Sequence, residues 1–306
     1  MRIRNEPAVD PESGRPFSSR NLVACLRRAG HWLIGTGVAA SSYPALQFPA
    51  AAQVSVDQAG NYQVRIDAID IGTGAWTALT QIAADALEVP PERVQLGIGD
   101  TSLPQALWAT ASTGTASWGW AIFNAASALR ARLQEEFGGN TPAEGLEATG
   151  TFQANPEAQQ YAMHAFGAQF AEVRVNMDTG EVCVPRLLGV FAAGHIINPK
   201  TARSQFLGGM TWGLSMALHE ESVLDPRFGD YVNHDFAEYH IATNADVGTI
   251  DVSWIDEEDP HVNPMGVKGI GEIGIVGTAA SIANAVYHAT GIRVRDLPIT
   301  LDKLLS

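Results

Sequence analysis

The run NPMGVKGIGEIGIVGTAASIANAV, residues 263–286, places one acidic side chain, Glu272, among glycines and small apolar residues. Glycines carry no Cβ, so another backbone segment or a ligand can approach them closely. A carboxylate in such surroundings is costly to bury unless a partner or a reaction uses it. The apolar periodicity predicts a helix over about 273–290 that ends at Gly291. Glu272 therefore lies at a helix start, where either a capping role or a chemical role fits.

The overall composition is that of a folded, acidic protein. The chain has 306 residues, of which 46% are hydrophobic and 17% are charged, so it can bury a substantial core. This length predicts about two domains or large lobes. The net charge of -14 argues against a nucleic acid partner, because phosphate binding requires a basic surface.

The cysteines, the histidines and the first residues predict a cytoplasmic chain without a metal site built from side chains. Cys25 and Cys183 are far apart and form no CxxC pair, and the eight histidines form neither HExxH nor HxH. The opening MRIRNEPAVDPESGRPFSS has no apolar signal segment, and no apolar run is long enough to span a membrane. A periplasmic location is expected only where a partner subunit carries the chain across the membrane.

Strand and helix patterns interleave along the chain, which predicts an α+β fold with two lobes of mixed β-sheet and helices packed on them. We expect an N-terminal arm at 1–30 with a short helical pattern, a first lobe at 31–138, a polar linker at 139–160 and a second lobe at 161–306. The predicted elements are strands over 62–71, 93–98 and 249–256, helices over 75–89, 117–136, 202–219 and 273–290, and a hairpin over 171–188 turning at 178–180.

Three loops rich in glycine or hydroxyl residues each precede a predicted helix. They are DIGTGAWT at 70–77, ATASTGTASWG at 109–119 and GVKGIGEIGIVG at 266–277. Unpaired N–H groups and the positive end of the helix dipole make a helix start suitable for an anionic ligand. One such loop is most often turn geometry, whereas three in one chain favour a large anionic cofactor.

The segment GIGEIG, residues 269–274, also matches the GxGxxG pattern of dinucleotide-binding folds, and Asp296 follows it. That pattern requires a buried strand directly before its first glycine, whereas the preceding NPMGVK has the composition of a turn. Glu272 would also place a negative charge where the pyrophosphate lies. A nucleotide-dependent oxidoreductase is therefore the least favoured function for this sequence.

Four segments, taken together and in order, resemble the molybdenum-cofactor-binding large subunit of the xanthine dehydrogenase and aldehyde oxidase family. The resemblance is nearest to the bacterial aldehyde oxidoreductase branch and extends over nearly the whole chain. The segments are DIGTGAWTALTQIAADALEVP (70–90), STGTASWG (112–119), INPKTARSQFLGGMTWGLSMALHEE (197–221) and KGIGEIGIVGTAASIANAVYHATGIRVRDLPITLDKLL (268–305).

The resemblance implies a role for each matching position. Glu272 matches the catalytic base of the family. The implied cofactor contacts are the glycine loop Gly72, Thr73 and Gly74, the small-residue loop Thr115, Ala116 and Ser117, the helix residue Gln205, and Lys268, Gly269 and Ile270 on the approach to Glu272. No protein side chain is implied as a ligand of the metal.

The resemblance also implies a function and partners. The family binds a molybdenum–molybdopterin cofactor, with the cytosine dinucleotide as one form, and hydroxylates an aldehyde or N-heterocycle with oxygen from water. The family's large subunit is roughly twice as long, and its first half carries a GGxGGK-type loop absent from this sequence. We therefore expect partners: the missing N-terminal half, an iron–sulfur subunit and an FAD subunit. The second alternative is a catalytically inactive remnant or interaction protein of the same family.

Overall fold

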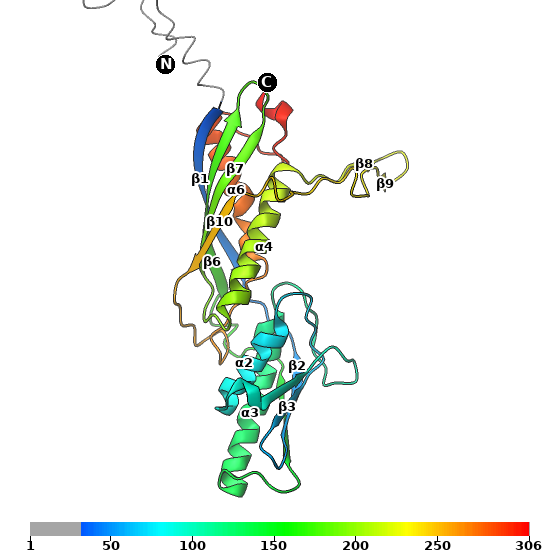
Figure 1. Cartoon of the computed structure of the whole chain (residues 1–306), viewed down its shortest axis with the longest axis vertical. Helices are drawn as coiled ribbons and strands as arrows, with labels where there is room; N and C mark the ends of the chain where they lie inside the picture. Colours follow the sequence, from blue (N-terminus) through cyan, green and yellow to red (C-terminus); the bar gives the residue numbers. More distant parts are fainter. Residues whose placement is uncertain (1–31, 306) are drawn as a thin grey trace, which may run out of the picture.

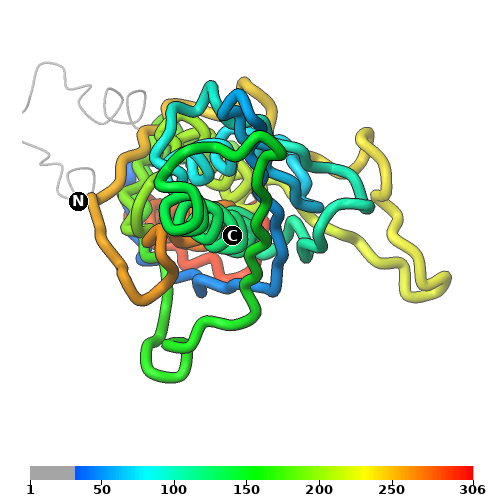
Figure 2. The backbone as a smooth tube through the Cα atoms, turned by 90° about the horizontal axis from the view of Figure 1, so that it is seen from below, coloured from blue at the N-terminus to red at the C-terminus, as the bar shows by residue number. Residues whose placement is uncertain are grey.

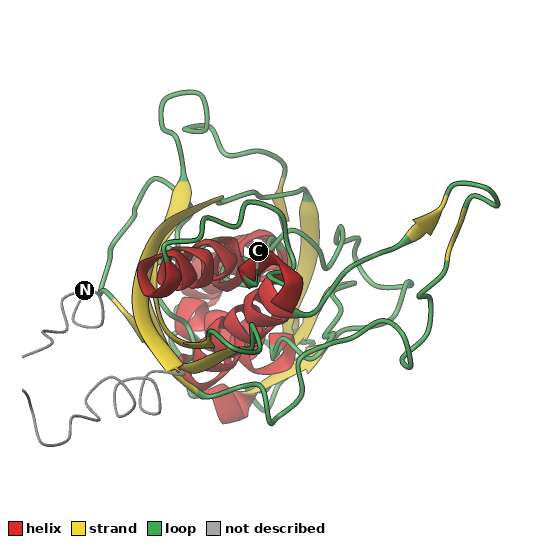
Figure 3. Cartoon of the chain, turned by 90° about the horizontal axis from the view of Figure 1, so that it is seen from above, coloured by secondary structure: helices red, strands yellow, loops and turns green. Residues whose placement is uncertain are grey.

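The computed structural model describes residues 32–305, which form two lobes stacked along the long axis of the molecule (Figure 1). Each lobe contains one four-stranded sheet with helices packed on it, so the predicted α+β fold is confirmed. Viewed along the long axis, the curved strands surround the helices (Figure 3). The expected arm at 1–30 and its helical pattern lie outside the described residues.

The second lobe is built on a four-stranded sheet in the order β1-β6-β7-β10. Neighbours β1, β6 and β7 are antiparallel, and β10 pairs parallel to β7. The predicted hairpin is confirmed, because β6 and β7 pair on either side of the turn at 178–180. The strands are β1 (Trp32–Pro44), β6 (His164–Asn176), β7 (Val182–Ala192) and β10 (Thr249–Trp254).

Helices α4 (Pro199–Leu218) and α6 (Thr278–Thr290) cover one face of this sheet, and the short α5 (Ile273–Val276) precedes α6. Helix α6 lies so close to β1 that a Cβ at Gly37 would overlap the backbone of α6. The core between sheet and helices contains the stacked rings of Phe191 and Phe206, whose centroids are 4.2 Å apart. Burial of such apolar side chains is the main favourable term for this lobe.

The first lobe is built on a sheet in the order β4-β3-β2-β5, against which α2 and α3 pack. The predicted strand–helix–strand unit is present: β3 and β4 are parallel neighbours, and α2 connects them. The elements are β2 (Ala50–Val56), β3 (Tyr62–Arg65), α2 (Ala75–Leu87), the 3₁₀ turn η1 (Pro91–Arg93), β4 (Val94–Gly97), α3 (Gly114–Phe137) and β5 (Leu146–Phe152).

The two sheets divide the chain differently from the expected ranges 31–138, 139–160 and 161–306. Strand β1 pairs along its full length with β6, so the start of the expected first lobe belongs to the second lobe. Strand β5 pairs with β2, so part of the expected linker belongs to the first sheet. Polar residues alternate with small buried ones in β5, which gives a strand a linker-like composition.

Local boundaries also differ. The strand expected over 62–71 ends at Arg65, and the chain then leaves the ladder while Ile66 and Ala68 stay buried. Helix α3 begins at 114, three residues before the predicted start. The helix expected over 273–290 is interrupted at Gly277, and its end at Gly291 in the left-handed region is confirmed.

An extended arm of residues 220–248 leaves the second lobe after α4 and carries the small hairpin of β8 (Leu224–Asp225) and β9 (Asp230–Tyr231). It extends away from the body in two perpendicular views (Figures 1 and 2). The 3₁₀ turn η2 (Leu301–Leu304) is the last element before residue 305. Among the helices of residues 32–305, none has the length and apolarity needed to cross a membrane.

Candidate functional site

A cavity of about 330 Å³ lies where the two lobes meet. Four segments from distant parts of the sequence line it: the loop before α2, the loop before α3, the start of α4 and the chain that leads into α5. Its polar lining residues include Thr73, Thr110, Ser112, Thr113, Thr115, His195, Asn198, Thr201, Gln205, Lys268 and Glu272.

The start of α2 is capped from within the chain. The carboxylate of Asp70 accepts hydrogen bonds from the backbone N–H groups of Gly72 at 2.9 Å, Gly74 at 3.2 Å and Trp76 at 3.2 Å. Burial raises the pKa of Asp70, but these backbone donors outweigh burial, so the pKa lies below its usual value. The amides of the glycine loop thus already have an anionic partner.

The start of α4 links the lobes and presents Gln205. The Asn198 side chain caps the helix by accepting from the N–H groups of Lys200 and Thr201, and its amide donates to Gln81 of α2 at 2.9 Å. Gln205 lies two turns into the helix and lines the cavity. Its Oε1 atom is 3.8 Å from the position of a Cβ on Gly271, so it lies beside the chain that carries Glu272.

The start of α3 is open to the cavity. Thr113 precedes the helix without a capping hydrogen bond from its side chain, and Gly114, Thr115 and Ala116 line the cavity. The helix therefore presents N–H groups and the positive end of its dipole to that space. Ser117 has another role: it is buried, donates to the Thr113 carbonyl and accepts from the N–H of Phe48 at 2.9 Å.

Glu272 is half-buried and occupies the N-cap position of α5 at the edge of the cavity, but its side chain makes no capping hydrogen bond to that helix. Its carboxylate accepts a hydrogen bond from the Ser112 hydroxyl, and its backbone N–H donates to the same Ser112 oxygen at 2.9 Å. Ser112 belongs to the loop before α3, so this reciprocal contact joins the two lobes.

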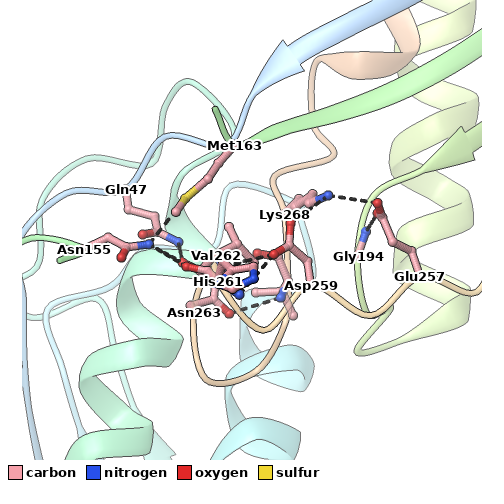
Figure 4. Close-up of polar contacts among 11 residues, drawn as sticks. Gln47, Asn155, Met163, Gly194, Glu257, Asp259, His261, Val262, Asn263 and Lys268 are labelled. Carbon is pink, nitrogen blue, oxygen red and sulfur yellow. Dashed lines mark hydrogen bonds and ion pairs between the residues drawn. The ribbon is translucent and has the colours of Figure 1, made fainter. Parts of the chain in front are cut away.

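Lys268 lies four residues before Glu272, but its ammonium group faces away from that carboxylate. Its side chain is 4% exposed and lies 3.0 Å from Glu257 and 3.1 Å from Asp259 (Figure 4). Burial raises the pKa of Asp259, but the hydrogen bond and the charge of Lys268 and two backbone donors bring it below its usual value. Glu257 also accepts from the backbone N–H of Gly194 at 2.6 Å.

The same segment is bonded to the two chain connections between the lobes, at Gln47 and Asn155 (Figure 4). The Gln47 side chain donates to the Val262 carbonyl at 2.8 Å, and the Asn155 side chain donates to the carbonyls of His261 and Val262 at 3.0 and 2.9 Å. Residues 257–272, which we call the junction segment, are therefore held by Gly194 of the second lobe and by both chain connections between the lobes. This fixes the position from which Glu272 enters the cavity.

The structure brings most of the sequence-predicted site residues to the cavity wall. Gly72, Gly74 and Ser117 are not among its lining residues. Those that line it are Thr73, Thr115, Ala116, Gln205, Lys268, Gly269, Ile270 and Glu272. Sequence reasoning missed Ser112 and Asp70, although both lie in the loops it singled out, and it missed Tyr43 entirely.

Residues 18–142 and 140–248 match the Molybdopterin cofactor-binding domain family. The aldehyde oxidoreductase molybdenum-binding subunit PaoC of Escherichia coli (strain K12) is 40% identical over 348 residues, covering 100% of this chain and 48% of the relative. The putative xanthine dehydrogenase molybdenum-binding subunit XdhA of the same organism is 28% identical, covering 99% and 48%.

Solved structures share the fold. Aldehyde oxidoreductase from Desulfovibrio gigas superposes with a TM-score of 0.80 at 22% identity, covering 97% of this chain and 37% of that chain. Quinoline 2-oxidoreductase from Pseudomonas putida 86 gives a TM-score of 0.80 at 25% identity, covering 93% and 43%. The chain thus spans about half the length of the curated relatives PaoC and XdhA.

Proposed function

Because the chain belongs to the Molybdopterin cofactor-binding domain family, we propose that it forms the cofactor-binding part of a molybdenum hydroxylase in which Glu272 is the catalytic base. One observation carries the proposal: Gln205 of α4 and Glu272 before α5 meet the open start of α3 in one cavity between the lobes. A role limited to helix capping would not explain why Glu272 lies beside a cavity and near Gln205 of another helix.

The residues around the cavity fit a molybdopterin cofactor at two places. The open start of α3 and the Gln205 amide supply neutral donors of the kind that an anionic, polar ring system requires. The glycine loop is a weaker match for a phosphate, because Asp70 already uses its amides. In this proposal, cofactor contacts come from Thr115, Ala116, Gln205 and the backbone of 268–270.

The chemistry that a bound molybdenum cofactor supplies is oxygen transfer from water with uptake of two electrons. The part of this chain is to bind, to orient and to move a proton. Glu272 lies at the cavity edge with no ion-pair partner among residues 32–305, so its carboxylate is free to accept a proton from the attacking oxygen. The substrate class in this proposal is an aldehyde or an N-heterocycle.

The proposal includes the rest of the assembly. PaoC and XdhA are named as molybdenum-binding subunits, and another relative is a subunit of a dehydrogenase complex of Paenarthrobacter nicotinovorans. We propose that the remaining half of the large subunit encloses the cofactor and contacts the substrate, and that iron–sulfur and FAD subunits carry the electrons away. A cytoplasmic location and the cytosine dinucleotide form of the pterin belong to the same proposal.

The test uses the assembled enzyme, with this chain co-expressed with the remaining half and the electron-transfer subunits in a host that makes the cofactor. Molybdenum per chain and turnover of aldehydes and N-heterocycles are measured for wild type and Glu272→Gln. We expect unchanged molybdenum content and a loss of turnover of about 10²- to 10⁴-fold, because an amide cannot accept the proton.

Glu258→Gln is the matched control, since Glu258 is an exposed acid on the junction segment. It should leave turnover unchanged. Near-normal turnover of cofactor-loaded Glu272→Gln would contradict the assignment of the base. Absence of molybdenum and of turnover in the assembled wild type would instead favour an inactive relative of the family.

A further inference from the structure

The contact between Ser112 and Glu272 is unusual because the single hydroxyl of Ser112 contacts two groups of Glu272. The Ser112 hydroxyl donates to the Glu272 carboxylate and accepts from the Glu272 backbone N–H at 2.9 Å. The hydroxyl thereby fixes both the side chain and the backbone of Glu272. A single helix-capping bond would fix only one of them.

The backbone at Ser112 is held in a conformation that disfavours ordinary residues. Ala111 and Ser112 have φ angles of 49° and 55°, in the left-handed region. Glu88, the other non-glycine residue with positive φ in the described chain, ends α2, where this conformation is common. A backbone conformation of this kind is unfavourable and persists only where surrounding contacts stabilise it.

Two glycines of the junction segment leave room for this loop to approach Glu272 closely. A Cβ at Gly269 would overlap the Ser112 carbonyl and lie 2.7 Å from the Ser112 Cβ. A Cβ at Gly271 would lie 3.1 Å from the Ser112 Oγ. The two glycines on the approach to Glu272 thus let the strained serine loop come close enough for its hydroxyl to reach the carboxylate.

Tyr43 brings a second hydroxyl to the same carboxylate. It lies near the end of β1, opposite Ala165 of β6, and is half-buried. Burial raises the pKa of Tyr43, the neighbouring Glu272 carboxylate raises it further, and the Ser112 hydroxyl lowers it. Tyr43 therefore keeps its proton at neutral pH and serves as a donor.

We propose that Ser112 and Tyr43 are positioning residues that hold the Glu272 carboxylate in its working orientation without neutralising its charge. The proposal rests on the assignment of Glu272 as the base. A cation at this place would suppress proton uptake, whereas two neutral hydroxyl donors orient the carboxylate and leave it anionic. The other titratable residues lining the cavity do not intervene: Lys268 is paired with Glu257 and Asp259, and the His195 ring lies 3.3 Å from the Met265 carbonyl.

The first arm of the test separates the hydroxyl of Ser112 from its backbone. Ser112→Ala and Ser112→Gly both remove the hydroxyl, but only glycine relieves the left-handed strain. In the assembled holoenzyme we expect both variants, and Tyr43→Phe, to keep molybdenum and lose about 10- to 100-fold in kcat, with KM little changed.

The matched control is Tyr239→Phe. Tyr239 donates to Glu220 at 2.9 Å, so this variant removes a tyrosine–glutamate hydrogen bond away from the cavity, and turnover should not change. A purely structural role for Ser112 predicts the opposite of our proposal: Ser112→Gly would then equal or exceed wild type in both stability and turnover.

The second arm needs no cofactor. The 306-residue chain, labelled with ¹³C at the tyrosine Cζ, is titrated by NMR in wild type and Glu272→Gln. We expect Tyr43 to titrate above the usual value of about 10 and to move toward it in Glu272→Gln. An unchanged Tyr43 titration, or wild-type turnover in Tyr43→Phe and Ser112→Gly, would overturn the proposal. Full turnover of Glu272→Gln would overturn the base assignment instead, while the NMR titration would still report the contact.

Discussion

Glu257 and Asp259 at one end of the junction segment and Glu272 at the other end lie in opposite electrostatic environments. The first two acids face the buried ammonium of Lys268 at 3.0 and 3.1 Å. Glu272 faces hydroxyl groups, and no ion pair of the described residues includes it. One end therefore uses charge to hold the junction segment in place, whereas the carboxylate at the other end has no cation beside it.

Lys268 and Glu272 are only four residues apart, yet they do not form an ion pair. An ammonium group that reached the cavity would pair with Glu272 and neutralise the proposed base. Glu257 and Asp259 together bind Lys268 away from it, and Gly194 anchors Glu257 in turn.

Lys268→Met should have the largest effect. It leaves two partly buried carboxylates without their cation, and we expect the free energy of unfolding to fall by about 3 kcal/mol. Denaturant titration at neutral pH measures this, with the exposed Lys200→Met as control. Adding Glu257→Gln and Asp259→Asn to Lys268→Met should recover part of the loss; a further loss would show that charge pairing is not what the network contributes.

Gly269→Ala should come next, at about 1–3 kcal/mol, because the methyl group overlaps the Ser112 backbone. The added methyl group should push the loop that carries Ser112 away from the Glu272 carboxylate. Chemical denaturation gives the stability, and Tyr43 NMR reports the carboxylate. Gly208→Ala is the control, since a Cβ there would meet nothing within 4 Å. Equal stability of the two variants would contradict the close approach.

Asp70→Ala tests a third carboxylate, whose partners are backbone amides, and should cost about 1 kcal/mol. The pKa of Asp70 is lowered in the fold, so its contribution is present above the unfolded value of about 4 and is lost as pH falls through the folded value. The difference between wild type and variant should be constant above about pH 5 and shrink below about pH 4. A difference that grew at low pH would contradict this sign.

Glu272→Gln should have the smallest effect on stability, within about 0.5 kcal/mol, because the amide still accepts from Ser112 and no cation loses a partner. The same denaturant titration measures it. A loss as large as that of Lys268→Met would show that Glu272 is a structural acid, like Glu257.

The sequence predicted the elements of this fold better than their grouping. Amphipathic periodicity located α2 and α4, and turn chemistry located the hairpin of β6 and β7. Nothing local in Trp32–Pro44 could show that this strand pairs with a partner beyond the whole first lobe, because register between distant strands is decided by tertiary packing. Residues 146–152 have the composition of a linker, and only their pairing with the distant strand β2 makes them a strand.

The site followed a similar pattern. Glu272 and Gln205 could be assigned because the resemblance carried their roles by position. Ser112 could not, since its importance comes from a left-handed backbone and from close contact with Gly269, neither of which has a signal in sequence spacing. Tyr43 lies in a strand with no motif, and only the assembled lobes bring it to the carboxylate.

The pairing of β1 with β6 has a consequence for how the chain reaches its fold. The first lobe begins and ends at neighbouring points, since Ala50 lies opposite Phe152. It thus has the form of an inserted domain, and its own folding brings the ends of β1 and β6 together. The entropic cost of bringing β1 and β6 together is then already covered when the second sheet forms. We therefore expect the inserted lobe to fold first and the surrounding lobe, with the site between them, to assemble on it.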